Sequence, residues 1–131
     1  MRVRMFMPQF ASLVKSGAKR QTIRPTPKRK CDMPKAGDLE SWRAWSDKPY
    51  RSKQVELTQV EIVSVERIRF EQSTNEFLVS LLDRPLRGAL MPIEDWSAFA
   101  KADGFESMFD MSVWFERTHG LPFEGILIKA K

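Results

Sequence analysis

The segment of residues 54–70, QVELTQVEIVSVERIRF, constrains the fold more than any other part of the chain. Its β-branched and aromatic residues favour a strand, because such side chains pack well on a pleated sheet. The alternation of apolar and polar residues slips once between Leu57 and Val60, which indicates a bulge or a bend. The fold must therefore contain a sheet with at least one long, irregular strand.

The rest of the chain adds shorter strands and three helices. Further strands are expected at residues 3–6, 21–24, 37–45, 76–82 and 124–131, with turns or loops at 25–37, 46–53 and 71–75. One helix should begin at Pro8 and end at Gly17. The last third changes to a helical period, with Trp96 and Phe99 inward on a helix from Pro92, and Met108, Met111 and Phe115 on one face of the next. This pattern predicts one α+β domain over residues 1–131, with a small twisted or barrel-like sheet.

The charge of the chain is unevenly distributed. The net charge is +5 over 131 residues, yet residues 1–53 carry +10 and residues 54–131 carry −5. Clustered Lys and Arg form an electrostatic footprint for phosphate-bearing ligands. The alternative is a solvated basic face beside an acidic helical half.

Several classes of protein are disfavoured by composition. No apolar run approaches the roughly 18–20 residues that span a bilayer. Cys31 is the single cysteine, so no internal disulfide is possible, which fits a reducing cytosol, and we expect a cytoplasmic protein. His119 is the single histidine, so a zinc site built by the protein alone is not expected.

The stretch GAKRQTIRP, residues 17–25, places three cations around one hydroxyl. Lys19, Arg20 and Arg24 surround Thr22, and strand alternation puts Thr22 and Arg24 on one face. Threonine needs a base to take its proton, and a lysine serves only when burial or nearby cations lower its pKa. Alternatively, Thr22 and Arg24 are ordinary strand residues and Lys19 is a solvated cation at a helix end.

A second basic segment interleaves aromatic rings with cations. It is SWRAWSDKPYRSK, residues 41–53, in which we expect Trp42 to be buried. Bases stack on aromatic faces while phosphates meet cations, so this composition suits single-stranded nucleic acid. The residues expected near such a ligand are Arg43, Trp45, Tyr50, Arg51 and Lys53, together with Arg20 and Arg24. Helix capping, rather than catalysis, is the favoured role of His119.

These motifs, in this order, resemble the ASCH family (activating signal cointegrator homology), in particular its small single-domain bacterial and phage members. Gly17, Lys19, Thr22 and Arg24 match the pattern G-x-K-x-x-T-x-R, and AGDLESW follows it. The later stretch AKADGFESMFDMSVWFERTHG resembles the family's acidic-Gly-Phe segment and the helix after it. The resemblance implies a PUA-like fold, a small β-barrel surrounded by helices, with a cleft between them.

The resemblance also implies activities. The family is associated with RNA binding; some small members hydrolyse N4-acylated cytidines and some process single-stranded RNA. Their lysine and threonine fall on Lys19 and Thr22, and their catalytic glutamate falls on Asp103, which is one methylene shorter. We therefore expect an RNA- or nucleotide-binding domain, with three alternatives open.

The cleft either hydrolyses single-stranded RNA, or deacylates N4-acylcytidine through Lys19, Thr22 and Asp103, or only binds RNA or a protein. No cofactor is expected, except that RNA cleavage would recruit Mg²⁺. Whether the protein is an enzyme at all stays open at this stage.

Overall fold

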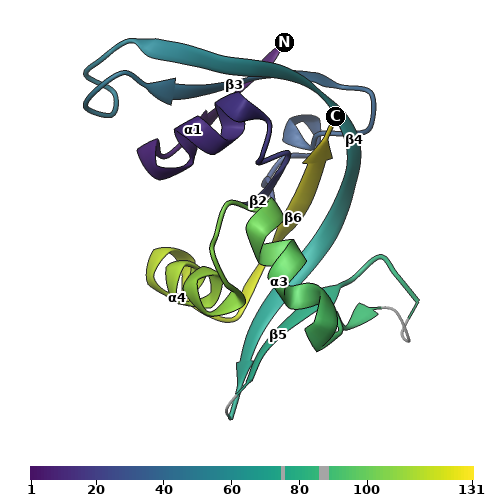
Figure 1. Cartoon of the computed structure of the whole chain (residues 1–131). Helices are drawn as coiled ribbons and strands as arrows, with labels where there is room; N and C mark the ends of the chain where they lie inside the picture. The colour runs from purple at the N-terminus through teal and green to yellow at the C-terminus, as the bar shows by residue number, and fades with distance from the viewer. Residues whose placement is uncertain (75, 86–88) are drawn as a thin grey trace.

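The computed structural model describes residues 1–74, 76–85 and 89–131. Its strands are β1 (Arg2–Phe6), β2 (Gln21–Pro25), β3 (Leu39–Trp45), β4 (Gln54–Ser73), β5 (Glu76–Leu81) and β6 (Phe123–Ala130). The α-helices of the described residues are α1 (Pro8–Ser16), α3 (Ile93–Ala102) and α4 (Met108–His119), and a short 3-10 helix, η1, covers Lys30–Asp32. Figure 1 shows this arrangement, which confirms the predicted α+β class with three helices.

The strands form one mixed sheet in the order β1-β3-β4-β6-β2, and β5 pairs with the C-terminal part of β4, on the edge opposite β6. β1 runs parallel to β3, and all other pairs are antiparallel. The predicted barrel is wrong, because no backbone pairing joins β1 to β2 in the described ranges. A cavity lined by both strands lies between their edges, and the sheet stays open there.

The long strand β4 is irregular where the sequence pattern slips. Trp42 of β3 pairs with Thr58, but the next residue, Arg43, pairs with Glu56, so Leu57 is left over as a bulge. A second shift occurs between Ile62 and Ser64, opposite β6. The strand bends along its length, so that one half pairs with β3 and the other with β5 (Figure 1). The predicted bulge is therefore confirmed.

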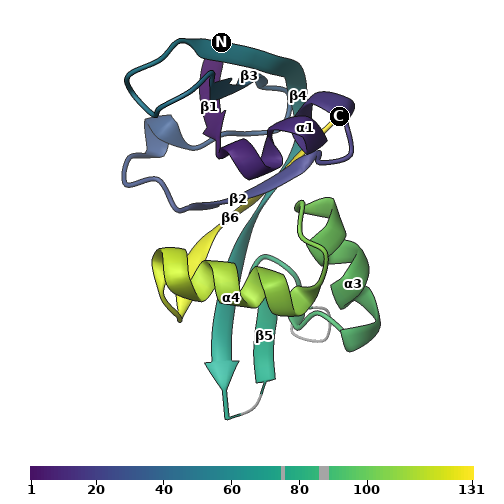
Figure 2. The same ribbon diagram turned by 60° about the vertical axis from the view of Figure 1, so that its left-hand side comes forward.

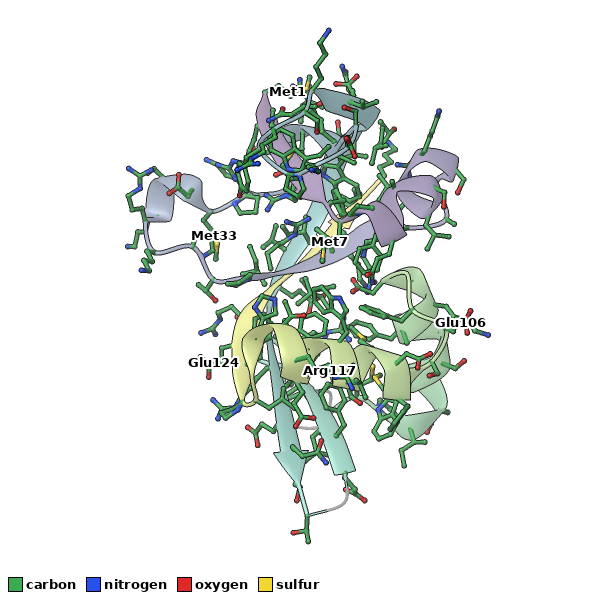
Figure 3. All side chains as sticks on the ribbon, turned by 90° about the vertical axis from the view of Figure 1, so that its left-hand side faces the viewer. Met1, Met7, Met33, Glu106, Arg117 and Glu124 are labelled. Carbon is green, nitrogen blue, oxygen red and sulfur yellow. The ribbon has the colours of Figure 1, made fainter. Side chains whose placement is uncertain are left out.

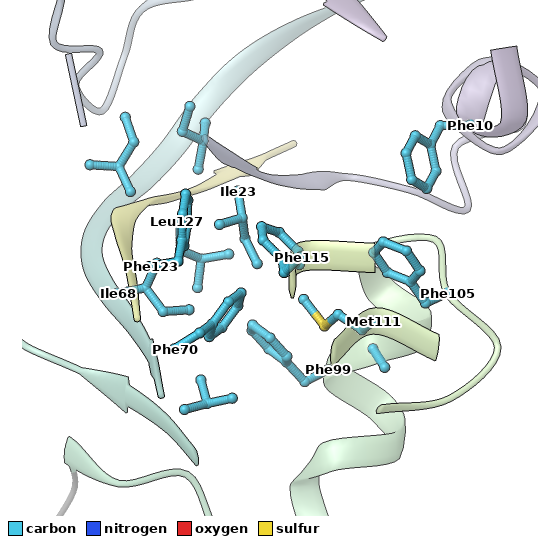
Figure 4. Packing of buried hydrophobic residues seen from close by; sticks show 14 of the residues in the cluster. Phe10, Ile23, Ile68, Phe70, Phe99, Phe105, Met111, Phe115, Phe123 and Leu127 are labelled. Carbon is cyan, nitrogen blue, oxygen red and sulfur yellow. The ribbon is translucent and has the colours of Figure 1, made fainter. Parts of the chain in front are cut away.

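The main core lies between the helices α3 and α4 and the sheet. Figure 2 shows α4 crossing in front of the strands β4 and β5, with α3 beside it. Phe99, Met111 and Phe115 of the two helices meet Phe70 and Leu127 of the sheet, as Figure 4 shows. The predicted inner faces of both helices are confirmed for Phe99, Met108, Met111 and Phe115, while Trp96 is only partly buried.

Two smaller expectations have different outcomes. Trp42 is fully buried, as predicted. The turn expected over residues 71–75 is partly wrong, because β4 continues to Ser73 and position 75 lies outside the described residues. Among the helices that the structure describes, none is both long and apolar enough to cross a membrane.

Candidate functional site

A cavity of about 240 Å³ lies at the gap between β1 and β2. The end of β1, the start of α1, the strand β2 and the C-terminal end of α4 surround it. Met7, labelled in Figure 3, marks its position between the two halves of the molecule. The lining residues are Met5, Phe6, Met7, Phe10, Lys19, Thr22, Ile23, Arg24, Pro25, Asp103, Phe105, Trp114, Phe115, Thr118 and His119. The three predicted catalytic residues therefore line one cavity, although Asp103 is more than eighty positions from Lys19 and Thr22 in the sequence.

Lys19 is placed by the end of α1. Gly17 ends this helix with φ of 88°, and the backbone N–H of Lys19 then donates to the carbonyl of Leu13. The Lys19 side chain is only 3% exposed, and its Nζ donates to the backbone carbonyl of Asp103. Nζ also lies 4.9 Å from the centre of the Phe10 ring. Burial lowers the pKa of Lys19, while the Asp103 carboxylate acts in the opposite direction.

Asp103 directly follows α3 and is buried beside Lys19. Its Oδ1 lies 3.4 Å from Lys19 Nζ and accepts a long, 3.4 Å hydrogen bond from Gln21 Nε2. Burial raises the pKa of Asp103 to about 6, although Lys19 and Gln21 act to lower it. The two buried partners thus shift in opposite directions, each toward its neutral form, because the cavity removes water from both.

Gly104 explains why a glycine follows this aspartate. Its φ is 96°, and a Cβ atom there would lie 2.9 Å from Phe10 Cδ1 and 3.2 Å from Lys19 Cδ. Only glycine combines this left-handed backbone with so close an approach. Gly104 therefore lets the backbone pass close to Lys19, and the short side chain of Asp103 lies within reach of Lys19 Nζ.

Arg24 connects the threonine to the open edge of the sheet. Its Nε donates to Thr22 Oγ1 at 3.0 Å, and its Nη2 donates to the carbonyl of Met5 at 2.8 Å. The guanidinium also stacks on Phe6, with 4.7 Å between Cζ and the ring centre. Burial, with the nearby charge of Arg4, lowers the pKa of Arg24 to about 10, so the side chain stays cationic at neutral pH. One side chain therefore bridges β1 and β2 and holds the hydroxyl of Thr22.

Aromatic rings form the apolar wall of the cavity. Phe10 contacts Phe105 and Trp114 edge to face, with ring centres 5.4 and 6.0 Å apart. His119 ends α4 and lines the same cavity, with its ring 4.9 Å from that of Phe123. Burial, and then Arg24, lower the pKa of His119.

Sequence reasoning missed these wall residues. The spacing of Phe10 on its helix indicates burial but not the cavity it faces, and the position of His119 before a glycine indicates a helix cap rather than a cavity residue. The sequence signal for His119 is a lone histidine at the end of an aromatic helix. This signal is too weak to assign His119 to the cavity.

The other predicted ligand-binding residues lie outside the cavity. Arg20 lines a separate surface hollow with Lys129. Arg43 is on β3, where its Nε donates to Ser41 Oγ and its Nη1 to Gln54 Oε1. Trp45, Tyr50, Arg51 and Lys53 belong to the hairpin that joins β3 to β4. The structure thus separates the predicted residues into a cavity set and a set on β3 and its hairpin, while Arg20 lies apart from both.

Neither a metal-binding group nor a known relative defines the site. The residues that the structure describes contain no group of three or more His, Cys, Asp and Glu side chains placed to hold a metal ion. Comparisons with protein-family models, with curated proteins and with solved structures found no match to this chain. The function is therefore argued from the geometry of the cavity.

Proposed function

We propose that the cavity binds one nucleobase, carried by RNA or by a free nucleotide or nucleoside. The observation that carries this proposal is the composition of its lining, in which Lys19, Thr22 and Arg24 are set among the rings of Phe10 and Trp114. Aromatic faces stack on bases, and a few fixed polar groups then select among their edges. A volume of about 240 Å³ suits a single base rather than several nucleotides.

The same residues support a relationship with the ASCH family. Lys19, Thr22 and Arg24 come from its motif, and Asp103 stands at the position of its glutamate. A curved sheet with helices beside a cavity also agrees with a PUA-like arrangement, here with the sheet left open between β1 and β2. We propose that the chain is a small ASCH-type domain.

Binding of a base is tested by calorimetry with the four ribonucleoside monophosphates and with short RNAs. Thr22→Val removes the hydroxyl at nearly constant volume, and Thr22→Ser keeps it. We expect the valine variant to bind the preferred nucleotide about tenfold more weakly, because Arg24 and the base edge lose a partner. The serine variant should bind like the wild type. If no nucleotide or RNA binds to the wild-type protein, the proposal is wrong.

Hydrolysis of an acylated base is a second candidate function, and the burial of Lys19 favours it. Burial lowers the pKa of Lys19, which brings this amine closer to the neutral form that a general base requires. Arg24 already donates to Thr22 Oγ1, so the guanidinium is placed to stabilise negative charge on that oxygen. Both features are needed to activate a threonine.

The step that we propose for Lys19 and Thr22 is deacylation of an N4-acylcytidine. Neutral Lys19 takes the proton of the Thr22 hydroxyl while Oγ1 attacks the acyl carbonyl carbon. The C–N bond breaks, Lys19 returns the proton to the departing amino group, and an acyl-threonine ester remains. Water then hydrolyses the ester, which gives cytidine and a carboxylic acid. Asp103 holds Lys19 in place.

The assay for this candidate follows the release of cytidine from N4-acetylcytidine, with a labelled single-stranded RNA as the second substrate. Thr22→Val should abolish release, and Thr22→Ser should keep part of it. Turnover that persists in the valine variant would contradict a threonine nucleophile. Cleavage of the RNA, with or without Mg²⁺, would instead identify a ribonuclease, and absence of both reactions alongside binding would leave a binding domain.

A further inference from the structure

The hairpin that joins β3 to β4 carries an exposed aromatic side chain that the fold does not require. Tyr50 is 88% exposed and has φ of 62°, in the left-handed region that tyrosine rarely adopts. Its ring lies 5.2 Å from that of Trp45, measured between centres and tilted by 49°. A strained, solvent-exposed aromatic residue costs stability without filling a core, which is typical of a binding position.

Hydrogen bonds within the hairpin fix the turn that carries this ring. Ser52 Oγ accepts from the backbone N–H of Asp47 and donates to the carbonyl of Lys48. The backbone N–H of Ser46 donates to the carbonyl of Lys53, and that of Arg51 donates to Lys48. The tip is therefore a defined turn, and the Trp45–Tyr50 pair is presented as a platform (the two rings together).

Three exposed cations flank the platform in the sequence of the hairpin. Lys48, Arg51 and Lys53 are exposed, and none of them forms an ion pair with another described residue. Unpaired cations beside an aromatic platform match the chemistry of single-stranded nucleic acid, whose bases stack and whose phosphates are negative.

The register of the sheet places this platform close to the cavity. Met5, which lines the cavity, is the β-pairing partner of Arg43, and Phe6 is the partner of Ala44, next to Trp45. Neighbouring strands lie about 5 Å apart, and two residues along a strand span about 7 Å. Arg43 and Trp45 lie on the same face of β3. A nucleic-acid strand that leaves the cavity over Met5 would therefore meet Arg43 and then the platform. Figure 1 shows the hairpin projecting from this end of the sheet.

We infer that the Trp45–Tyr50 platform is a second nucleotide subsite, which stacks a base near the one held in the cavity. The ligand is then a single-stranded RNA rather than a free nucleoside. This inference rests on the proposed binding of a base in the cavity.

The test measures fluorescence anisotropy of short labelled single-stranded RNA homopolymers, with nucleoside monophosphates as competitors. Tyr50→Asn removes the ring, while asparagine accepts the left-handed backbone. We expect it to weaken RNA binding roughly fivefold to a hundredfold, the range measured for one stacked base, and to leave the binding of the monophosphate unchanged. Tyr50→Phe should bind like the wild type.

Two further variants separate the possible outcomes. Phe109→Ala removes an aromatic ring that is 75% exposed on α4, away from the hairpin, and should leave RNA affinity unchanged. Thr22→Val should weaken both RNA and the monophosphate. If Tyr50→Asn binds RNA like the wild type while Thr22→Val does not, the second subsite is wrong and the proposed cavity site stands. If RNA binding depends on Tyr50 but not on Thr22, the cavity proposal fails, and the two-subsite arrangement fails with it.

Discussion

Lys19 and Asp103 owe their properties to burial rather than to their neighbours in sequence. Each is 3% exposed, and each has a pKa shifted toward the neutral form, although they partner one another. A buried ion pair gains little over an apolar pair of the same shape, so stability alone is a poor reason for this arrangement. The burial of Lys19 agrees better with the proposed role of this amine as a base.

The titration of Asp103 should be visible in the pH dependence of stability. Its pKa is about 6 in the folded state, against an ordinary value of 3.8. The stability due to its proton is therefore fully present below about pH 3.8 and is lost as the pH rises through about 6. Asp103→Asn removes this loss, and without the carboxylate the pKa of Lys19 falls further, which acts in the same direction.

We therefore compare the free energy of unfolding of Asp103→Asn with that of the wild type. The difference between them should shift in favour of the variant by about 1–3 kcal/mol as the pH rises from about 4 to 7. Urea denaturation of both proteins across this range measures the difference. A difference that does not change with pH would show that Asp103 titrates as it does in water.

The close approach at Gly104 gives a second prediction. Gly104→Ala combines backbone strain with contacts to Phe10 and Lys19 that are too short, and should cost about 2–4 kcal/mol. Gly37→Ala is a matched control, because φ is 94° there and nothing lies within 4 Å of the new Cβ. The control should lose only the strain, about 1–2 kcal/mol, in thermal or urea denaturation. Equal losses would mean that the packing at Gly104 is loose.

The residues of the site could be predicted to different degrees. Lys19, Thr22 and Asp103 were identified because the motif and the resemblance name them, and the structure places them in one cavity. The bond from Arg24 to Met5 could not be predicted, because it depends on how far β1 lies from β2. The cavity wall was missed for a related reason, since an apolar spacing indicates burial without saying what the side chain faces.

Among the elements, β1 is an edge strand that pairs only with β3. A buried ion pair joins the two strands. Arg4 Nε and Nη2 each donate to Glu40 at 2.7 Å, and Trp42 Nε1 donates to the same carboxylate at 3.0 Å. Burial acts to raise the pKa of Glu40, but these hydrogen bonds outweigh it and lower the pKa.

Breaking this pair should release β1. Glu40 is fully buried, so Glu40→Gln leaves the Arg4 charge without its partner and should cost about 3–5 kcal/mol. Asp32→Asn, which breaks the exposed pair with Arg29, should change stability very little. Hydrogen exchange of the β1 amides, together with denaturation, measures both effects. Protection of β1 that is unchanged in Glu40→Gln would show that pairing with β3 alone holds the strand.

Most elements could be predicted because their signals are local. The period of α4 and the proline and glycine that bound α1 act within a few residues, and so does the slip that marks the bulge at Leu57. The parallel pairing of β1 with β3 and the open edge beside β2 could not be predicted. They depend on how separate segments of the chain meet, which a pattern within one segment does not record.

For the whole molecule, the division of charge sets how it meets a ligand. The cavity and the hairpin draw their cations from residues 1–53, which carry +10, while residues 54–131 carry −5. A negatively charged nucleic-acid strand would therefore be attracted toward residues 1–53 and repelled by the acidic helices α3 and α4.

Salt should reveal the number of contacts with phosphate. For a single strand, the logarithm of the association constant falls with the logarithm of salt concentration by about 0.7 for each phosphate neutralised. Replacing both Arg51 and Lys53 with alanine should make this slope less steep by about 1.4, in the anisotropy assay with RNA. Lys101→Ala, on the exposed surface of α3, should leave it unchanged. An unaltered slope in the double variant would mean that the hairpin does not touch the strand.

Conservation of Arg24 among related sequences would not by itself indicate a binding function. Arg24 of β2 bonds to Met5 of β1 and to Thr22. This one side chain therefore connects the two strand edges that backbone pairing leaves unjoined. Selection for folding alone would therefore retain an arginine there, while Thr22 would drift among residues that tolerate burial. A library sorted only for resistance to protease should keep Arg24 and lose Thr22, and one sorted for ligand binding should keep both. Invariance at position 22 would therefore indicate selection for use of this cavity, whereas invariance at position 24 is expected from selection for folding alone.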